Sequence, residues 1–393
     1  MNPLVAARRT VVAVVLLVFV LSLSASAAAR PTPRETAPKP RTLAIANDSI
    51  ETFTQDSGAI AWVDSSRRVE LQRISTGKRW LLGWSAGGGR RANQWPTLLA
   101  LAGERAVWTE YWGGNSLEIV LKTSSPADLR VHGRRRATSV ATLGTGDPWY
   151  CGGTERYFAG LAGDGATVFD AELELRPIPI MGGDAWLQKV SGGTFAQVTR
   201  PSPDRPTVLR TIAGVSAPTA LYSDQGDAWV VPRPLAVSRE RIAVLPPADQ
   251  TSTVGADPVQ AENGPVKVFD ANGTLVSQVF PLGTVREIAL SWPKLAVLVQ
   301  RHDGTMAVER YDARAGALEL ASAVPSRASD VAIGPGGLVY RVGNSIYVLG
   351  RRQPTLLWRA KGEPIGLSVV GRRAAWAVDF APRGRIVALT LPR

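Results

Sequence analysis

A short phrase of small apolar residues, an aromatic or branched anchor residue and a polar break recurs along this 393-residue chain. It stands near the beginning as "GAIAWVDSSRRVELQRISTG" (58–77) and again at the end as "GRRAAWAVDFAPRGRIVALTLP" (371–392). The anchors of the successive copies are Trp62, Trp108, Phe169, Val244, Val297, Tyr340 and Trp376. Stacked repeats build a continuous core, and they allow a chain longer than about 250–300 residues to fold as one domain.

The pattern within each repeat is that of β-strands. Apolar and polar residues alternate in "VELQRIS", "LEIVLKTS", "MAVERYD" and "SIYVLGR", and turn sequences such as "STGK", "DANGT" and "DARAGA" follow. Alternation with period two is typical of half-buried strands, and Gly, Asn and Asp favour the turns between them. Four strands in about 45 residues are typical of a propeller blade. We therefore predict an all-β fold, a β-propeller of seven blades with four antiparallel strands each, and six blades as the alternative.

The two ends of the chain predict how the ring closes. The last repeat supplies only three strands, "IGLSVV", "RAAWAVD" and "RIVALTLP", whereas "RTLAIAN" (41–47) stands before the first full repeat. Unpaired edge strands tend to pair with other chains. We expect the N-terminal strand to complete the last blade; the alternative is that 41–47 is a linker.

The N-terminal residues predict export. Arg8 and Arg9 precede an apolar run and the small residues "SASAAA", which is the order of a signal peptide over residues 1–29. An uncleaved membrane anchor is the alternative, and only in that case do we expect contact with a membrane. A proline-rich linker is predicted over 30–40 and the propeller domain over 41–393. The expected location is extracytoplasmic: secreted, periplasmic or at the cell surface.

The repeats also resemble a known group of proteins. The A-x-W anchor, together with "STGKRWLL" and "VFDANGTLV", resembles the repeats of TolB-like and WD40-like secreted bacterial β-propellers. The resemblance covers residues about 41–393. TolB itself carries an α/β domain before its propeller, where this chain has only the proline-rich stretch, and the Trp-Asp dipeptide of WD40 repeats is absent. Regular tryptophan-docking motifs of quinoproteins are absent too, so the resemblance implies no quinone cofactor.

Residues for catalysis are few. The chain has two histidines, His132 and His302, one cysteine, Cys151, and no Gly-x-Ser-x-Gly elbow. Neither a nucleophile–base pair nor a zinc-ligand spacing can be assembled from them, and Cys151 is expected to be a packed side chain. We therefore predict no catalytic residue, no metal site and no cofactor.

Carboxylates from separate blades leave one enzymatic alternative open. Glu110, Asp170 and Asp379 follow the anchors closely, and they could approach one another on the same face of the ring. Two suitably spaced carboxylates cleave glycosidic bonds. The alternative function is therefore a carbohydrate-active hydrolase or lyase.

The charge and the loops favour binding. The formal net charge is +12, which favours anionic partners. In a propeller the loops between second and third strands, and those between blades, emerge on one face and commonly bind ligands. Arginines suit carboxylates and phosphates, and aromatic rings suit sugars or protein anchors. The candidate binding residues in these loops are Arg90, Arg91, Trp95, Tyr111, Trp112, Arg134, Arg135, Arg136, Trp149, Tyr150, Arg301 and His302.

The alternative for these residues is purely structural, with tryptophans packed between blades and arginines merely solvated. The polar insert 246–265 is expected on the same face. The predicted function is an exported, non-enzymatic binding or scaffold module for an envelope protein or an anionic polymer. Nucleic acid is not an expected partner because the chain is predicted to be exported.

Overall fold

The structure is a computed structural model, and it describes residues 39–391 with several gaps. The gaps are 85–94, 113–117, 133–137, 146–147, 155–156, 163–164, 171–174, 179–184, 192–193, 200–206, 214–218, 225–233, 246–264, 271, 351–353 and 381–382. The predicted signal peptide and most of the linker therefore lie outside the described residues. Within the described residues the chain forms eight four-stranded antiparallel sheets.

The first four sheets follow one another along the chain, and we number them as blades 1 to 4. Blade 1 contains β2 (Ile50–Gln55), β3 (Ala59–Asp64), β4 (Arg68–Arg73) and β5 (Arg79–Trp84). Blade 2 contains β6 (Trp95–Ala102), β7 (Arg105–Trp112), β8 (Glu118–Ser124) and β9 (Thr138–Thr145), with the short helix α2 (Pro126–His132) between β8 and β9. Blade 3 contains β10 (Pro148–Thr154), β11 (Tyr157–Ala162), β12 (Gly165–Asp170) and β13 (Leu175–Ile178). Blade 4 contains β14 (Ala185–Ser191), β15 (Thr194–Thr199), β16 (Thr207–Ala213) and β17 (Thr219–Asp224).

The remaining four sheets are blades 5 to 8. Blade 5 contains β18 (Leu235–Ser238), β19 (Arg241–Val244), β20 (Val266–Asp270) and β21 (Leu275–Val279). Blade 6 contains β22 (Thr284–Ser291), β23 (Lys294–Gln300), β24 (Met306–Asp312) and β25 (Ala317–Val324). Blade 7 contains β26 (Ala328–Gly334), β27 (Gly337–Val342), β28 (Ser345–Leu349) and β29 (Pro354–Arg359). Blade 8 contains β30 (Ile365–Val370), β31 (Arg373–Phe380), β32 (Arg383–Thr390) and β1 (Arg41–Ile45).

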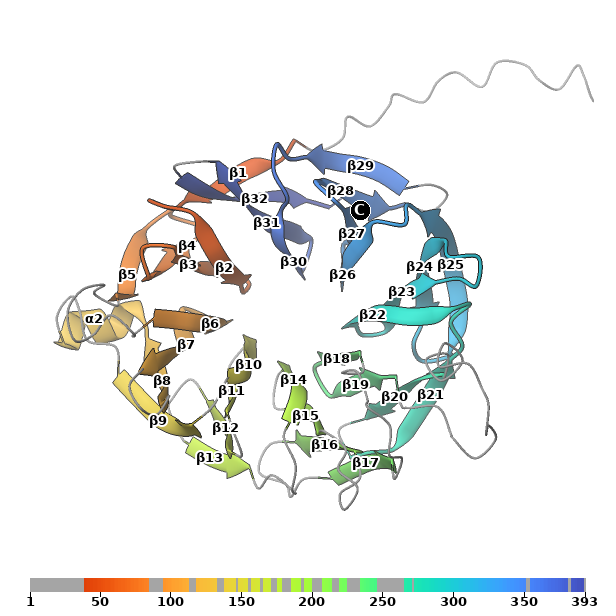
Figure 1. The fold of residues 1–393 in the computed structure, drawn as a ribbon, viewed down its shortest axis with the longest axis horizontal. Helices are drawn as coiled ribbons and strands as arrows, with labels where there is room; N and C mark the ends of the chain where they lie inside the picture. The colour runs from red at the N-terminus through yellow and green to blue at the C-terminus, as the bar shows by residue number, and fades with distance from the viewer. Residues whose placement is uncertain are drawn as a thin grey trace, which may run out of the picture. The chain divides into compact units, whose positions relative to one another are not determined.

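The blades are arranged in a ring around a common axis (Figure 1). The first strand of each blade is innermost and contacts the first strand of the next blade, and β30 of blade 8 contacts β2 of blade 1. The predicted all-β propeller of four-stranded antiparallel blades is thereby confirmed. The predicted number of seven blades, and the alternative of six, are wrong, because the described residues form eight.

The miscount has a local cause. The predicted anchor Phe169 lies in β12, a third strand, rather than in the second strand of blade 3. The interval between Phe169 and Val244 contains the whole of blade 4, whose second strand reads "TFAQVT" and has no apolar run around its aromatic residue. A search for the repeated phrase therefore does not detect blade 4.

The predicted closing strand is confirmed. β1 pairs antiparallel with β32, with Arg41 opposite Ala388 and Ile45 opposite Arg385. The adjoining blade 1 also holds β1: Gln72 Nε2 donates to the backbone oxygen of Leu43 at 2.5 Å. The N-terminal strand therefore covers the edge of the last blade, which would otherwise be open to pairing with another chain.

Side chains also bridge blade 8 and blade 1. The guanidinium of Arg373 donates to Gln55 Oε1 at 2.7 Å and to the backbone oxygens of Asp56 and Ser57 at 2.5 and 3.1 Å. Asp379 Oδ1 accepts a hydrogen bond from the backbone N–H of Ile50 at 2.9 Å. These bonds join segments that are more than 300 residues apart in the sequence.

The core lies between neighbouring blades, where the anchors of the second strands are buried. Trp62, Trp108 and Trp376 have no exposed surface. Trp108 of blade 2 packs against Gly83 in the outermost strand of blade 1, and a Cβ at Gly83 would lie 2.5 Å from the indole ring. A buried tryptophan removes about 150–250 Å² from water. The repeated phrase thus places one large side chain at each of these junctions.

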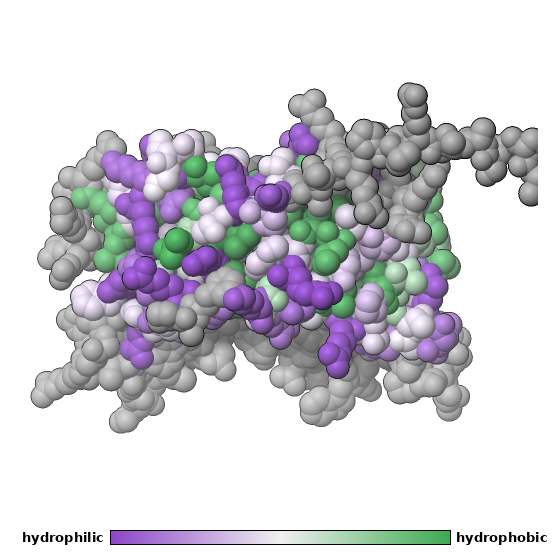
Figure 2. All heavy atoms as spheres, turned by 90° about the horizontal axis from the view of Figure 1, so that it is seen from above, coloured by the Kyte–Doolittle hydropathy of each residue, from purple (hydrophilic) through white to green (hydrophobic). Residues whose placement is uncertain are grey.

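The wall of the ring is mixed in character, with hydrophilic side chains separated by smaller hydrophobic patches (Figure 2). Several of the hydrophobic residues on outermost strands are partly exposed, including Leu81, Trp84, Leu318 and Leu356. Single exposed apolar residues of this kind are normal on soluble proteins. None of the helices among the described residues has the length and apolar character needed to cross a membrane.

Candidate binding face

One end of the ring gathers the connections from which binding surfaces are usually built. In each blade the first strand begins, and the second strand ends, at this end of the ring; in blade 6, for example, Thr284 at the start of β22 lies opposite Gln300 at the end of β23. The connections between blades, and those between second and third strands, therefore emerge here. We call this end the loop face.

Seven of the twelve predicted binding residues lie on the loop face according to their backbone. They are found where first strands begin, where second strands end, or in the β23–β24 turn: Trp95, Tyr111, Trp112, Trp149, Tyr150, Arg301 and His302. Arg301 is half-buried and His302 is exposed. The five aromatic residues, and Cys151 in β10, are placed by their backbone alone.

The other five predicted residues lie outside the described residues. Arg90 and Arg91 belong to segment 85–94, between β5 and β6 in the sequence. Arg134, Arg135 and Arg136 belong to a segment that joins β8 to β9, the third and fourth strands of blade 2. The assignment of these three arginines to the loop face stays a prediction, because they lie outside the described residues.

The first strands share a feature that the sequence analysis missed. Seven of the eight contain a register shift close to their start, and β18 is the exception. A bulge adds a residue to one strand and re-aims the side chain there. A single residue is bulged in five strands: Glu51, Trp149, Trp186, Arg286 and Asp330. All seven shifts lie near the start of a first strand, which is the end of the strand at the loop face.

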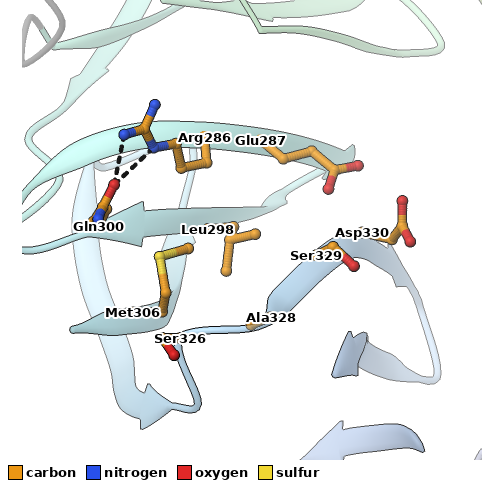
Figure 3. A pocket seen from close by; sticks show the side chains of 9 residues that line it. All are labelled: Arg286, Glu287, Leu298, Gln300, Met306, Ser326, Ala328, Ser329 and Asp330. Atoms are coloured by element: carbon orange, nitrogen blue, oxygen red, sulfur yellow. Dashed lines mark hydrogen bonds between the residues drawn. The ribbon is translucent and has the colours of Figure 1, made fainter. Parts of the chain in front are cut away.

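A pocket of about 440 Å³ opens on the loop face between blades 6 and 7 (Figure 3). Pockets that hold small ligands measure about 300–1,000 Å³. Both neighbouring bulged residues, Arg286 of β22 and Asp330 of β26, line it. The lining residues are Arg286, Glu287, Leu298, Gln300, Met306, Ser326, Ala328, Ser329 and Asp330.

The basic end of the pocket is formed by Arg286, whose Nε and Nη2 donate to Gln300 Oε1 at 3.2 and 2.5 Å. Figure 3 shows these two residues on one side of the pocket and Glu287 and Asp330 on the other. Leu298 and Met306, both buried, form an apolar floor between them. The pocket therefore offers a guanidinium and carboxylates at separate positions.

The acidic end is tied to the structure of blade 7. Glu287 Oε2 accepts a hydrogen bond from the backbone N–H of Val331 at 2.9 Å, which links the two blades. Asp330 forms an ion pair with Arg341, whose Nη1 also donates to Glu363 Oε1 at 2.6 Å. Burial alone would lower the pKa of Arg341, but the two carboxylates raise the pKa above its ordinary value. Arg341 therefore stays charged between Asp330 and Glu363.

An apolar loop lies next to the pocket. Phe280 and Leu282, in the connection from blade 5 to blade 6, are 66% and 57% exposed. The backbone of this loop is fixed: the Tyr311 hydroxyl donates to the Phe280 oxygen at 3.2 Å, and Glu309 Oε2 accepts from the Leu282 N–H at 3.2 Å. A side chain at Gly283 would collide with the backbone of Gln300. The loop is thus packed directly against the strand that lines the pocket.

The hydroxyl of Tyr311 remains a hydrogen-bond donor at physiological pH. Its single proton is shared between the Phe280 oxygen and Glu309 Oε2, and the contact with Glu309 is the shorter one at 2.6 Å. Burial and the neighbouring carboxylate raise the pKa of Tyr311 above its ordinary value. The Tyr311 hydroxyl therefore keeps its proton, and its contact with the Phe280 oxygen, at physiological pH.

The carboxylates of the enzymatic alternative do not form a shared site on the loop face. Glu110 is buried, where it accepts from Trp108 Nε1 at 3.0 Å and pairs with Lys122 Nζ at 2.6 Å. Asp379 accepts the inter-blade bond described above. Asp170 ends β12, a third strand, and so lies at the opposite end of its blade; the prediction that the three could share a face is wrong. In the part of the chain that the structure describes, no group of three His, Cys, Asp or Glu side chains could hold a metal ion.

Comparison with known proteins supports the architecture. The sequence matches no protein-family model and no curated protein. The computationally designed protein Ika8 has a similar structure, with a TM-score of 0.57 and 13% identity over 89% of this chain and 98% of that one. The fold is that of a β-propeller.

Two natural proteins are similar in structure as well. Sqt1 of Saccharomyces cerevisiae gives a TM-score of 0.56 with 10% identity over 90% of this chain and all of that one. The β-propeller domain of the Trilobed protease from Pyrococcus furiosus, described as having an open velcro topology, gives 0.52 with 10% identity over 75% of this chain and 95% of that one. In contrast to an open arrangement, β1 pairs with β32 here. At these identities the likeness concerns the fold alone.

Proposed function

We propose that this chain is an exported, non-enzymatic β-propeller that binds an envelope protein through its loop face. The observation that carries the proposal is the pair Phe280 and Leu282, exposed on a hydrogen-bonded loop beside a pocket with a charged lining. Protein–protein interfaces are enriched in aromatic residues, including phenylalanine, and in methionine and arginine. Because the loop is already ordered, binding would cost little conformational entropy.

The exposed apolar residues support a protein partner over a polymer alone. An anionic polymer would require cations, which Arg286 and Arg301 supply, but it would gain little from an exposed phenylalanine and leucine. The net charge of +12 favours an acidic protein surface and an anionic polymer alike, and it would speed the encounter with either. We therefore place an anionic polymer second and a carbohydrate-active enzyme third.

Export is part of the proposal. Residues 1–29 support export, because a positively charged pair, an apolar run and small residues follow one another as in a signal peptide. The resemblance of the repeats to TolB-like secreted propellers supports it as well. A periplasmic or cell-surface location would expose the loop face to envelope proteins. Fractionation of the producing cells tests the location separately from the binding.

Site-specific photo-crosslinking tests the binding. A photoreactive amino acid is placed at Leu282, and at Leu318 as a matched control, because Leu318 is also an exposed leucine but lies on an outermost strand. We expect a defined protein adduct in cells from position 282, its loss when Phe280→Ser is added, and none from position 318. Equal adducts from both positions, or none from 282, would contradict the proposal.

The runner-up functions give different results. Retention of the purified protein on anionic wall polymer, lost with rising salt and unaffected by Phe280→Ser, would support polymer binding. Turnover of glycan that is abolished by Glu110→Gln would support the enzymatic alternative.

A further inference from the structure

We infer that Arg301 binds an acidic side chain of the partner, beside the apolar residue of the partner that contacts Phe280 and Leu282. The inference rests on the proposed function, because it takes the ligand to be a segment of a protein. It adds the charge that this segment must carry next to its apolar residue. The position of Arg301, the partners of its side chain and the turn around it support the inference.

Arg301 lies directly beside the apolar loop. A Cβ at Gly283, in this loop, would lie 2.4 Å from the backbone oxygen of Gln300 and 3.1 Å from the Cα of Arg301. The pairing of β23 with β24 continues to Arg301, whose N–H donates to the backbone oxygen of Thr305 at 2.8 Å. Successive side chains of a strand point to opposite faces, so Arg301 shares the face of Val299, which belongs to the core between blades 5 and 6. Arg301 is therefore on the side of the loop, whereas Gln300 lines the pocket.

The side chain of Arg301 is available to a ligand. In the part of the chain that the structure describes, its guanidinium has no hydrogen-bond or ion-pair partner. The residue is half-buried, so its side chain is partly accessible from the loop face. Because an arginine stays protonated in proteins, Arg301 places a positive charge next to two exposed apolar side chains.

The carboxylate in the same turn is bonded to another residue. Asp303 Oδ1 accepts a hydrogen bond from the N–H of Thr305 at 2.9 Å and from the hydroxyl of Thr305 at 2.6 Å. These hydrogen bonds, and to a smaller extent the charge of Arg301, lower the pKa of Asp303. Asp303 therefore stays ionised and bonded within its turn, and it leaves the donors of Arg301 to a ligand.

A carboxylate next to an apolar side chain is the ligand that fits this arrangement. A guanidinium can form two parallel N–H···O bonds with a carboxylate, and such charge-assisted bonds are about twice as strong as neutral ones. Phe280 and Leu282 are 66% and 57% exposed, and a partner that covers them would exclude water from the neighbouring charge pair. The attraction between opposite charges is stronger where water is excluded. A lysine or arginine of the partner at this position would be repelled.

Selection from a phage-displayed library of random peptides tests the inference. The targets are the full-length protein and its variants Arg301→Glu and Arg383→Glu. Arg383 is the matched control, because it is also an arginine on the loop face but begins β32 in blade 8. We expect the wild type and the control to enrich peptides with an apolar and an acidic residue. Arg301→Glu should enrich peptides with a basic residue in place of the acidic one.

A synthetic peptide from the wild-type selection gives the quantitative test. Its Kd should rise at least about tenfold with Arg301→Glu and stay unchanged with Arg383→Glu. Replacing the acidic residue of the peptide by lysine should restore binding to Arg301→Glu, because the two charges are then exchanged. Thermal unfolding of each variant is measured alongside. If Arg301→Glu does not fold, Arg301→Gln, which removes the charge alone, should weaken the binding of the wild-type peptide.

The outcomes separate this inference from the proposed function. Peptides may lose binding with Phe280→Ser and yet show no acidic preference, or bind Arg301→Glu as tightly as the wild type. Either result would overturn the inference and leave the proposed function standing. If the selection yields no peptide that depends on Phe280, the proposed function fails, and the inference fails with it.

Discussion

We predict that replacing a buried tryptophan by phenylalanine lowers the free energy of unfolding more at Trp108 than at Trp376. Trp108 and Trp376 are both fully buried in second strands. Nε1 of Trp108 donates to Glu110 Oε1 at 3.0 Å, whereas Nε1 of Trp376 has no hydrogen-bond partner. A buried donor without a partner costs free energy in the folded state, whereas a hydrogen bond to a charged acceptor stabilises it.

The magnitude follows from these contacts. Replacing either tryptophan by phenylalanine removes a similar apolar volume and leaves a similar cavity. At Trp108 the change also removes a hydrogen bond to a charged group, worth about 1.5–3 kcal/mol, and leaves the buried Glu110 with one donor fewer. At Trp376 no bond is lost, because none is made. Trp108→Phe is therefore expected to lower the free energy of unfolding by about 1.5–3 kcal/mol more than Trp376→Phe.

Urea unfolding followed by circular dichroism measures this difference. Similar m-values for the two variants would show that the unfolded states are comparable. The control adds Glu110→Gln to both variants. Because this change removes the charged acceptor of the Trp108 indole, the difference in the free energy of unfolding between the two variants should become smaller. Equal destabilisation, or a greater loss from Trp376→Phe, would refute the reasoning from the indole N–H.

Three shorter predictions concern closure, packing and acid stability. Deletion of residues 41–47 exposes the edge of β32, so light scattering should show concentration-dependent self-association; a monomer of unchanged stability would contradict the closing role. Gly83→Ala places a methyl group 2.5 Å from the neighbouring indole and should destabilise by about 1–3 kcal/mol in urea, whereas Gly58→Ala, with open space around it, should not. Hydrogen bonds from Arg314 lower the pKa of Asp312 to about 2. Because the folded-state pKa lies below the unfolded one, this stabilisation is present near neutral pH and is lost as the pH falls from about 4 towards 2; Asp312→Asn should therefore flatten the acid limb of a stability–pH curve.

The sequence predicts the fold where the anchors are strong. Tryptophans at 62, 108 and 376 mark second strands, and "RTLAIAN" marks the closing strand, because each of these has to fill a fixed place in the ring. Blade 4 is not predicted because its second strand, "TFAQVT", has polar residues at positions where the anchored second strands have an apolar run. The predicted number of blades requires every repeat to be recognised, so one weakly patterned repeat is enough to make it wrong.

The candidate site is only partly predictable. The loop face follows from strand order, and Arg301 and His302 were correctly placed on it. The bulges at Arg286 and Asp330 were missed because a bulge is defined by how two strands pair, and the sequence of one short strand does not give that pairing. Phe280 and Leu282 carried a readable signal, since apolar residues flank a proline in a connection between blades.

Hydrogen–deuterium exchange tests the central claim, that the loop face of blades 5 to 7 is the binding surface. It is measured on the protein alone and in complex with the partner found by photo-crosslinking. We predict slower exchange in the complex at residues 280–287, 298–306 and 326–331, and no change in the turn 313–316 at the opposite end of the ring. Protection confined to that turn, or to the outermost strands, would contradict the account.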